Sequence, residues 1–69
     1  MSSGARGLSE REVRVLQLAA EGRTGAQIAE ELHVAPSAVQ GILDGIYAKL
    51  DVADRASAVA YALGAGLVT

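Results

Sequence analysis

Few side chains in this sequence could carry out chemistry. It has no cysteine and a single histidine, His33, so neither a disulfide framework nor a zinc site can be assembled. The adjacent carboxylates Glu30 and Glu31 diverge on a helix, and neither a base nor a nucleophile accompanies them. The 69 residues contain no phosphate-binding glycine loop. The sequence therefore predicts a protein that is not an enzyme and binds neither a metal nor a cofactor.

Charge and hydropathy limit the remaining classes of protein. Six Lys and Arg residues stand against eight Asp and Glu residues, a net charge of -2, whereas isolated DNA-binding domains are usually basic. No apolar run reaches the roughly 18 residues that span a bilayer, and the first residues lack the apolar region of a signal peptide. We therefore expect a cytoplasmic protein that makes no membrane contact.

The spacing of capping residues predicts an all-α domain of four helices. Ser9 with Glu12, and Thr24 with Gln27, have the spacing of capping boxes, and Asp54 is expected to cap the last helix. The predicted helices cover about residues 10–21, 25–32, 36–50 and 55–65. The second and third are joined by a three-residue turn, which is typical of a helix-turn-helix.

The domain is expected to begin at residue 8. Residues 1–7 are rich in Ser and Gly and are predicted to be a disordered tail or linker, and residues 8–69 a single domain. The third helix is expected to turn one apolar stripe to the core: Val39, Ile42, Leu43, Ile46 and Leu50. Four side chains of the fourth helix are also expected to face the core: Ala56, Val59, Ala60 and Leu63.

Several motifs resemble those of LuxR-type (NarL/GerE) DNA-binding domains. The resemblance runs through the segments 8–13 (LSEREV), 20–22 (AEG), 28–32 (IAEEL) and 54–56 (DRA). The first three helices alone also resemble region four of bacterial sigma factors, but the segments 54–56 and 66–68 (GLV) favour the LuxR type. The match covers nearly the whole predicted domain.

The resemblance implies sequence-specific binding of double-stranded DNA by a bacterial transcriptional regulator. In this family the third helix enters the major groove, the second crosses the DNA backbone and the fourth often forms a two-fold dimer contact. The expected base contacts lie on the outer face of the third helix: Ser37, Gln40, Gly41 and Asp44. The expected backbone contacts are Arg23, Thr24, Lys49 and Arg55. The expected homodimer contact is a strip on the fourth helix: Ala58, Tyr61, Ala62 and Ala65.

The third helix departs from the family's usual pattern. Gln40 stands where the family usually has a lysine, and Asp44 where it often has a polar or basic residue. Gln40 could bond adenine bidentately, and Asp44 could accept from cytosine N4. Contacts from Arg23, Lys49 and Arg55 would give a log-affinity versus log-salt slope of about -2.7. We therefore expect a monomer to bind DNA weakly, and a dimer to double the contacts.

A protein-protein interaction module on the same scaffold is the alternative function. The net charge of -2, Asp44 and the missing lysines favour it. If Arg23, Lys49 and Arg55 lie together beside the outer face of the third helix, DNA is favoured; if they are scattered, a protein partner is favoured. No sensory domain accompanies the helices, so we expect either part of a longer regulator or a small free-standing one.

Overall fold

The computed structural model describes residues 7–69, which form four helices around one hydrophobic core. The helices are α1 (Glu10–Ala20), α2 (Gly25–Leu32), α3 (Pro36–Leu50) and α4 (Arg55–Gly64). This confirms the predicted all-α fold, with α1 and α4 each ending one residue before the predicted bound. The predicted tail, 1–7, lies outside the described residues except for Gly7. Within 7–69, no helix is both long and apolar enough to cross a membrane.

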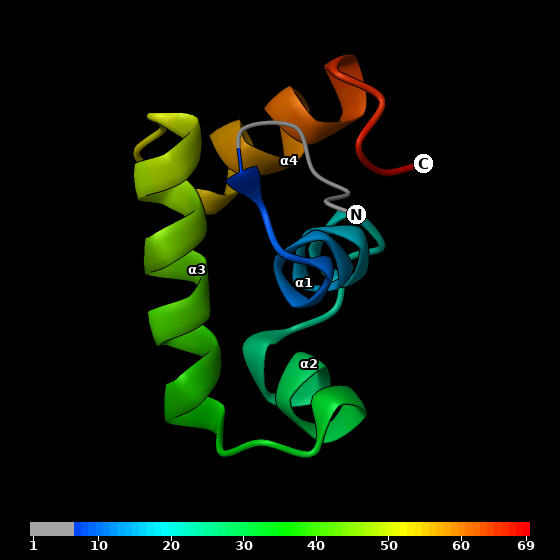
Figure 1. The fold of residues 1–69 in the computed structure, drawn as a ribbon. Helices are drawn as coiled ribbons and strands as arrows, with labels where there is room; N and C mark the ends of the chain where they lie inside the picture. The colour runs from blue at the N-terminus through cyan, green and yellow to red at the C-terminus, as the bar shows by residue number, and fades with distance from the viewer. Residues whose placement is uncertain (1–6) are drawn as a thin grey trace.

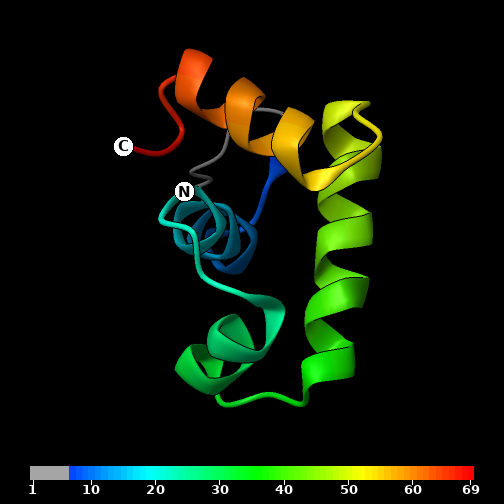
Figure 2. The same ribbon diagram turned by 180° about the vertical axis from the view of Figure 1, so that it is seen from behind.

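The helix α3 runs along one side of the domain, and the other three helices lie on a single side of it (Figure 1). The view from behind shows the same arrangement, with α1 between α2 and α4 (Figure 2). After α4 the chain turns back toward α1, where Gln17 Nε2 donates to the main-chain oxygen of Thr69 at 3.1 Å. The Thr69 N–H donates in return to Gln17 Oε1 at 3.0 Å. Because α1, α2 and α4 all lie on one side of α3, these helices leave the opposite face of α3 uncovered.

Both predicted capping boxes are present. The Glu12 N–H donates to Ser9 Oγ at 3.1 Å, and the Ser9 N–H donates to Glu12 Oε1 at 2.9 Å. The same reciprocal pair joins Thr24 and Gln27, at 3.1 and 2.8 Å. Each box satisfies main-chain donors that the first turn of a helix leaves unpaired. These local bonds fix where α1 and α2 begin.

The turn between α2 and α3 is set by two residues. His33 has φ 60 and ψ 45, the left-handed conformation in which a helix commonly ends. The Val34 N–H then bonds the carbonyl of Ala29 at 3.0 Å, which closes the end of α2. Pro36 is the first residue of α3, and Ala35 before it is extended, with φ -68 and ψ 147. The chain therefore reverses within three residues and places α3 against α2.

Most of the core comes from α1 and α3. The largest fully buried side chains are Leu16, Ile28, Ile46, Val15 and Val39. Four of the five residues of the predicted α3 stripe are buried, while Ile42 is half-buried. Because this stripe faces inward, the residues on the opposite side of α3 face solvent.

The predicted inward face of α4 is wrong for three of its four residues; the fourth, Val59, is half-buried and packs against the core. Ala58 and Ala62 are 1% and 0% exposed, whereas Ala56 and Ala60, expected in the core, are exposed. Leu63, also expected in the core, is 50% exposed. In α4 the small methyl groups are the side chains buried against the core, and the larger Leu63 lies at its edge. The surface of α4 that a partner can reach therefore includes Ala56, Ala60 and Leu63, and it excludes Ala58 and Ala62.

Candidate nucleic-acid interface

The outer face of α3 carries the four predicted base-contacting residues. Ser37, Gln40, Gly41 and Asp44 are all exposed and share one face of the helix, because residues three, four and seven apart lie on the same side. The other helices lie on one side of α3 in both views (Figures 1 and 2), and the buried stripe of α3 packs against them, so the exposed residues lie on the far side. A Cβ added at Gly41 would meet no atom within 4 Å. The face is therefore open and shallow at its centre.

Two of these residues are bonded to each other. Gln40 Nε2 donates to Asp44 Oδ1 at 2.9 Å, one helical turn along. The sequence predictions did not include this bond. Their spacing of four residues could have indicated the bond, because residues four apart are neighbours on a helix surface.

The start of α2 presents the second predicted contact. Thr24 is exposed and caps the helix with its hydroxyl oxygen. The next main-chain N–H groups, of Gly25 and Ala26, belong to the first turn, where an α-helix provides no internal acceptors. Such a turn attracts anions because its N–H groups and the helix dipole point the same way. This end of α2 is chemically suited to a phosphate.

Arg23 is held by carboxylates on the α1–α2 side of the domain. Its guanidinium lies 3.7 Å from Glu21 and 3.6 Å from Glu31. Glu31 also pairs with Arg14 at 3.1 Å. The side chains in these pairs are 40% to 55% exposed, so each bridge is weak and can exchange partners. Arg23 is reachable by a phosphate, but its charge is partly neutralised.

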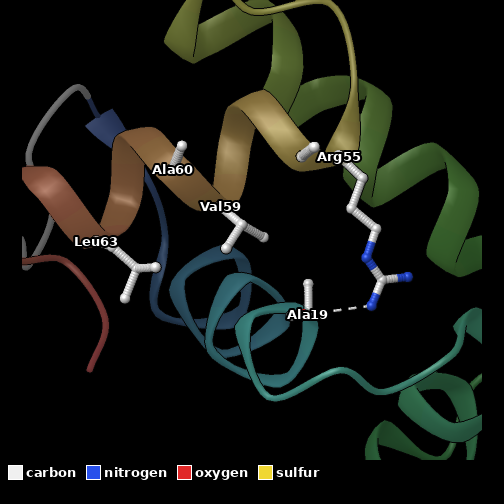
Figure 3. A pocket seen from close by; sticks show the side chains of 6 residues that line it. Ala19, Arg55, Val59, Ala60 and Leu63 are labelled. Atoms are coloured by element: carbon white, nitrogen blue, oxygen red, sulfur yellow. Dashed lines mark hydrogen bonds between the residues drawn. The ribbon is translucent and has the colours of Figure 1, made fainter.

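Arg55 and Lys49 are bound at opposite ends of α1. Arg55 Nη2 donates to the carbonyl of Ala19, at the C-terminal end of α1, at 3.4 Å (Figure 3), and to that of Arg23. Lys49 Nζ lies 2.7 Å from Glu12 Oε1, at the N-terminal end, and 3.3 Å from the carbonyl of Gly7. Two of the three cations among the predicted backbone contacts, Arg23 and Arg55, are therefore adjacent, and Lys49 is separate.

Lys49 stabilises the ionised form of the Glu12 carboxyl at the N-terminal end of α1. Burial raises the pKa of the Glu12 carboxyl, but the hydrogen bonds from Lys49 and from the Ser9 N–H outweigh burial and hold that pKa below its usual 4.5. The Asp54 carboxyl also has a lowered pKa, because it accepts the Ser57 N–H at the start of α4. Both carboxylates stabilise the first turn of a helix, as their spacing predicted.

The predicted dimer strip does not form a surface. Ala58 and Ala62 are buried inside the domain, so they cannot contact a second copy; Tyr61 is half-buried and Ala65 exposed. The apolar surface of α4 lies elsewhere, around a shallow groove of about 560 Å³ between α4 and the end of α1 (Figure 3). It is lined by Ala19, Arg55, Ala56, Val59, Ala60 and Leu63.

A short helix, a three-residue turn and a longer helix with an open outer face define a helix-turn-helix domain. Residues 6–62 match the family described as bacterial regulatory proteins, luxR family. The chain belongs to this family, and its fold is the family's DNA-binding domain.

The similar proteins are transcription regulators and response regulators. The transcriptional regulatory protein LiaR of Bacillus subtilis is 44% identical over 55 residues, which cover 80% of this chain and 26% of LiaR. The probable transcriptional regulatory protein NarL of Mycobacterium tuberculosis is 50% identical over 56 residues, 81% of this chain and 26% of NarL. The response regulator protein VraR of Staphylococcus aureus is 38% identical over 61 residues, 88% and 29%. The chain spans about a quarter of the length of these relatives.

Proposed function

We propose that this domain binds double-stranded DNA sequence-specifically, with α3 in the major groove, as part of transcription control. The observation that carries the proposal is the open outer face of α3, where Ser37, Gln40, Gly41 and Asp44 are exposed together. The major groove admits one α-helix, and polar side chains on its outer face reach the base edges.

The start of α2 would rest on the DNA backbone. Thr24 and the first-turn N–H groups would meet one phosphate, and Arg23 would meet another after leaving Glu21 and Glu31. Arg55 bonds the carbonyl of Arg23, so it keeps a positive charge beside this loop even without touching DNA. Lys49 is paired with Glu12 at the other end of α1 and would contribute only after breaking that pair.

We further propose that the domain acts on DNA as a homodimer through α4. The contact would use the exposed Ala56, Ala60 and Leu63, in place of the buried Ala58 and Ala62. Two copies would double the few phosphate contacts of one domain and read two half-sites.

The test is a titration of the purified chain with random duplex DNA, followed by fluorescence anisotropy at rising salt. We expect saturable binding at low salt and a log-log slope between about -2 and -5. Arg23→Gln should reduce the steepness of this slope by about 0.9. Arg11→Gln removes the same charge from an exposed position on α1 and should leave the slope unchanged. Absence of binding at low salt would refute the proposal.

Binding of a protein is the second candidate function. It is favoured by the net charge of -2, by the pairing of Arg14, Arg23 and Lys49 with carboxylates, and by the separation of Lys49 from Arg23. The same titration decides between the two functions, because a protein-binding face would give no salt-dependent affinity for DNA.

A further inference from the structure

We propose that Asp44 positions the amide of Gln40, and that the two residues together select an adenine and a nearby cytosine. The inference rests on the proposed function and deepens it, because it names the bases that the outer face of α3 reads. The observation that carries it is the bond from Gln40 Nε2 to Asp44 Oδ1, at 2.9 Å, on the exposed face of α3.

The bond fixes which way the amide of Gln40 faces. A free glutamine amide can turn over and exchange its donor and acceptor ends, so it can satisfy several base edges. A carboxylate only accepts hydrogen bonds. Asp44 therefore holds the NH2 group of Gln40 and leaves Oε1 on the opposite side of the amide.

The remaining groups of Gln40 match adenine. Asp44 accepts one of the two N–H groups of the amide. We take it to be the N–H trans to Oε1, so that the second N–H remains beside Oε1. Adenine offers a donor at N6 and an acceptor at N7 side by side in the major groove, and a glutamine amide binds this pair bidentately. Guanine offers two acceptors there, O6 and N7, which would leave Oε1 of Gln40 facing an acceptor.

The remaining oxygen of Asp44 matches cytosine. Asp44 keeps Oδ2 as an acceptor, and cytosine N4 is the donor that a carboxylate takes from in the major groove. Residues four apart rise about 6 Å along a helix, and successive bases of one strand are about 3.4 Å apart. The two selected bases should therefore fall within about two base pairs of one another.

The neighbouring residues leave this selection undisturbed. Ser37 and Gly41, the other exposed residues of the predicted set, carry neither a charge nor a long side chain. Arg and Lys make the commonest specific contact with guanine, and neither residue type occurs among Ser37, Gln40, Gly41 and Asp44. The open space over Gly41 allows the helix to approach the base edges closely.

The test is selection of binding sites from a random duplex library by the full chain and by two variants, followed by anisotropy titrations with single-base changes. The wild-type chain should enrich sites with an adenine and a cytosine within about two base pairs, and should lose about tenfold in affinity when either is replaced. Gln40→Ala should lose the adenine preference and keep the cytosine preference.

Asp44→Asn separates positioning from charge. It removes one negative charge, so affinity for random DNA should rise severalfold, as it would if Asp44 only repelled phosphates. Asparagine presents both a donor and an acceptor, so it should also relax the adenine preference, although Gln40 itself is unchanged. A purely electrostatic role would leave the adenine preference intact. Both side chains are exposed, and an unchanged circular dichroism spectrum would establish that each variant folds.

The outcomes distinguish the two proposals. A wild-type chain that enriches no sequence refutes the proposed function itself. Enrichment of sites that lack an adenine and a cytosine within about two base pairs refutes only the inference. An adenine preference that survives Asp44→Asn does the same.

Discussion

Lys49 Nζ lies 2.7 Å from Glu12 Oε1, and this contact joins the last turn of α3 to the first turn of α1. Glu12 also accepts the Ser9 N–H, so one carboxylate both caps α1 and pairs with α3. Its side chain is 15% exposed, against 42% for Lys49. The start of the domain is therefore held by a contact 37 residues apart in sequence.

Glu12→Gln should lower stability in a pH-dependent way. Glutamine still serves a capping box, so the loss isolates the ion pair, and it should be about 0.5 kcal/mol at pH 7. The pKa of Glu12 is below 4.5 in the folded chain. The stabilisation by Glu12 is therefore complete when the pH is above the pKa of Glu12 in the unfolded chain. It disappears as the pH falls through the pKa in the folded chain.

Urea unfolding followed by circular dichroism at pH 7 and pH 3 measures this difference. The difference between the variant and the wild type should be largest at pH 7 and smaller at pH 3. Some pH dependence should persist in the variant, because the lowered pKa of Asp54 acts in the same direction. An equal difference at both pH values would contradict the assignment to the ion pair.

Arg55→Lys tests whether Arg55 supports the fold. Its guanidinium donates to the carbonyls of Ala19 and Arg23 from a partly buried position, and lysine has no planar fork to reach both. We expect a loss of about 1 to 2 kcal/mol in the free energy of unfolding, measured by urea titration. The matched change Arg11→Lys, at an exposed residue, should cost almost nothing. Equal stability of the two variants would show that the carbonyl bonds contribute little.

The parts of the fold that depend on local sequence could be predicted. Ser9 with Glu12, Thr24 with Gln27, and Pro36 act within a few residues of their position, so the starts of the helices followed from spacing alone. The large apolar side chains of α3 lie on one face of the helix only. That face was predicted to be buried, so the opposite face was identified as the outer face.

The orientation of α4 could not be predicted, because alanine occupies every second position from 56 to 62. An alternating pattern of one small residue produces no helical stripe, and the larger Leu63 wrongly indicated the inward face, whereas Val59 does pack against the core. The hydrogen-bond partners of Lys49 and Arg55 could not be predicted either, because they lie 32 to 42 residues away in sequence. Only the packing of α1 against α3 and α4 brings them together.

Gly41→Ala and Gly45→Ala should separate helix stability from DNA contact. Alanine is better than glycine inside a helix by about 1 kcal/mol. A Cβ at Gly41 meets nothing within 4 Å, and one at Gly45 meets Glu12 Oε2 at an ordinary 3.7 Å. Both variants should therefore unfold at higher urea concentration. Only Gly41→Ala should weaken DNA binding, because Gly41 belongs to the outer face. Equal DNA affinities of the two variants would remove Gly41 from the interface.

Glu31→Gln should strengthen DNA binding. Glu31 pairs with both Arg14 and Arg23, so its neutralisation removes an ion pair that Arg23 must break to reach a phosphate. Affinity should therefore rise severalfold, while the salt slope, which counts the phosphates contacted, stays the same. Glu30→Gln makes the same change in net charge at the adjacent exposed residue and is the control. Anisotropy titrations at several salt concentrations compare them. If both variants gain affinity equally, net charge alone is responsible.

Leu63→Glu should disrupt the proposed homodimer without unfolding the domain. Leu63 is 50% exposed on the rim of the α4 groove, so a charge there remains hydrated in a monomer and is buried only in a dimer. Ala62→Glu is the contrasting change: Ala62 is 0% exposed, and a carboxylate there should unfold the chain. Sedimentation equilibrium and circular dichroism should show a folded monomer for the first variant and loss of helix for the second. A wild-type chain that remains monomeric at high concentration, both free and on DNA with two half-sites, would refute dimerisation through α4.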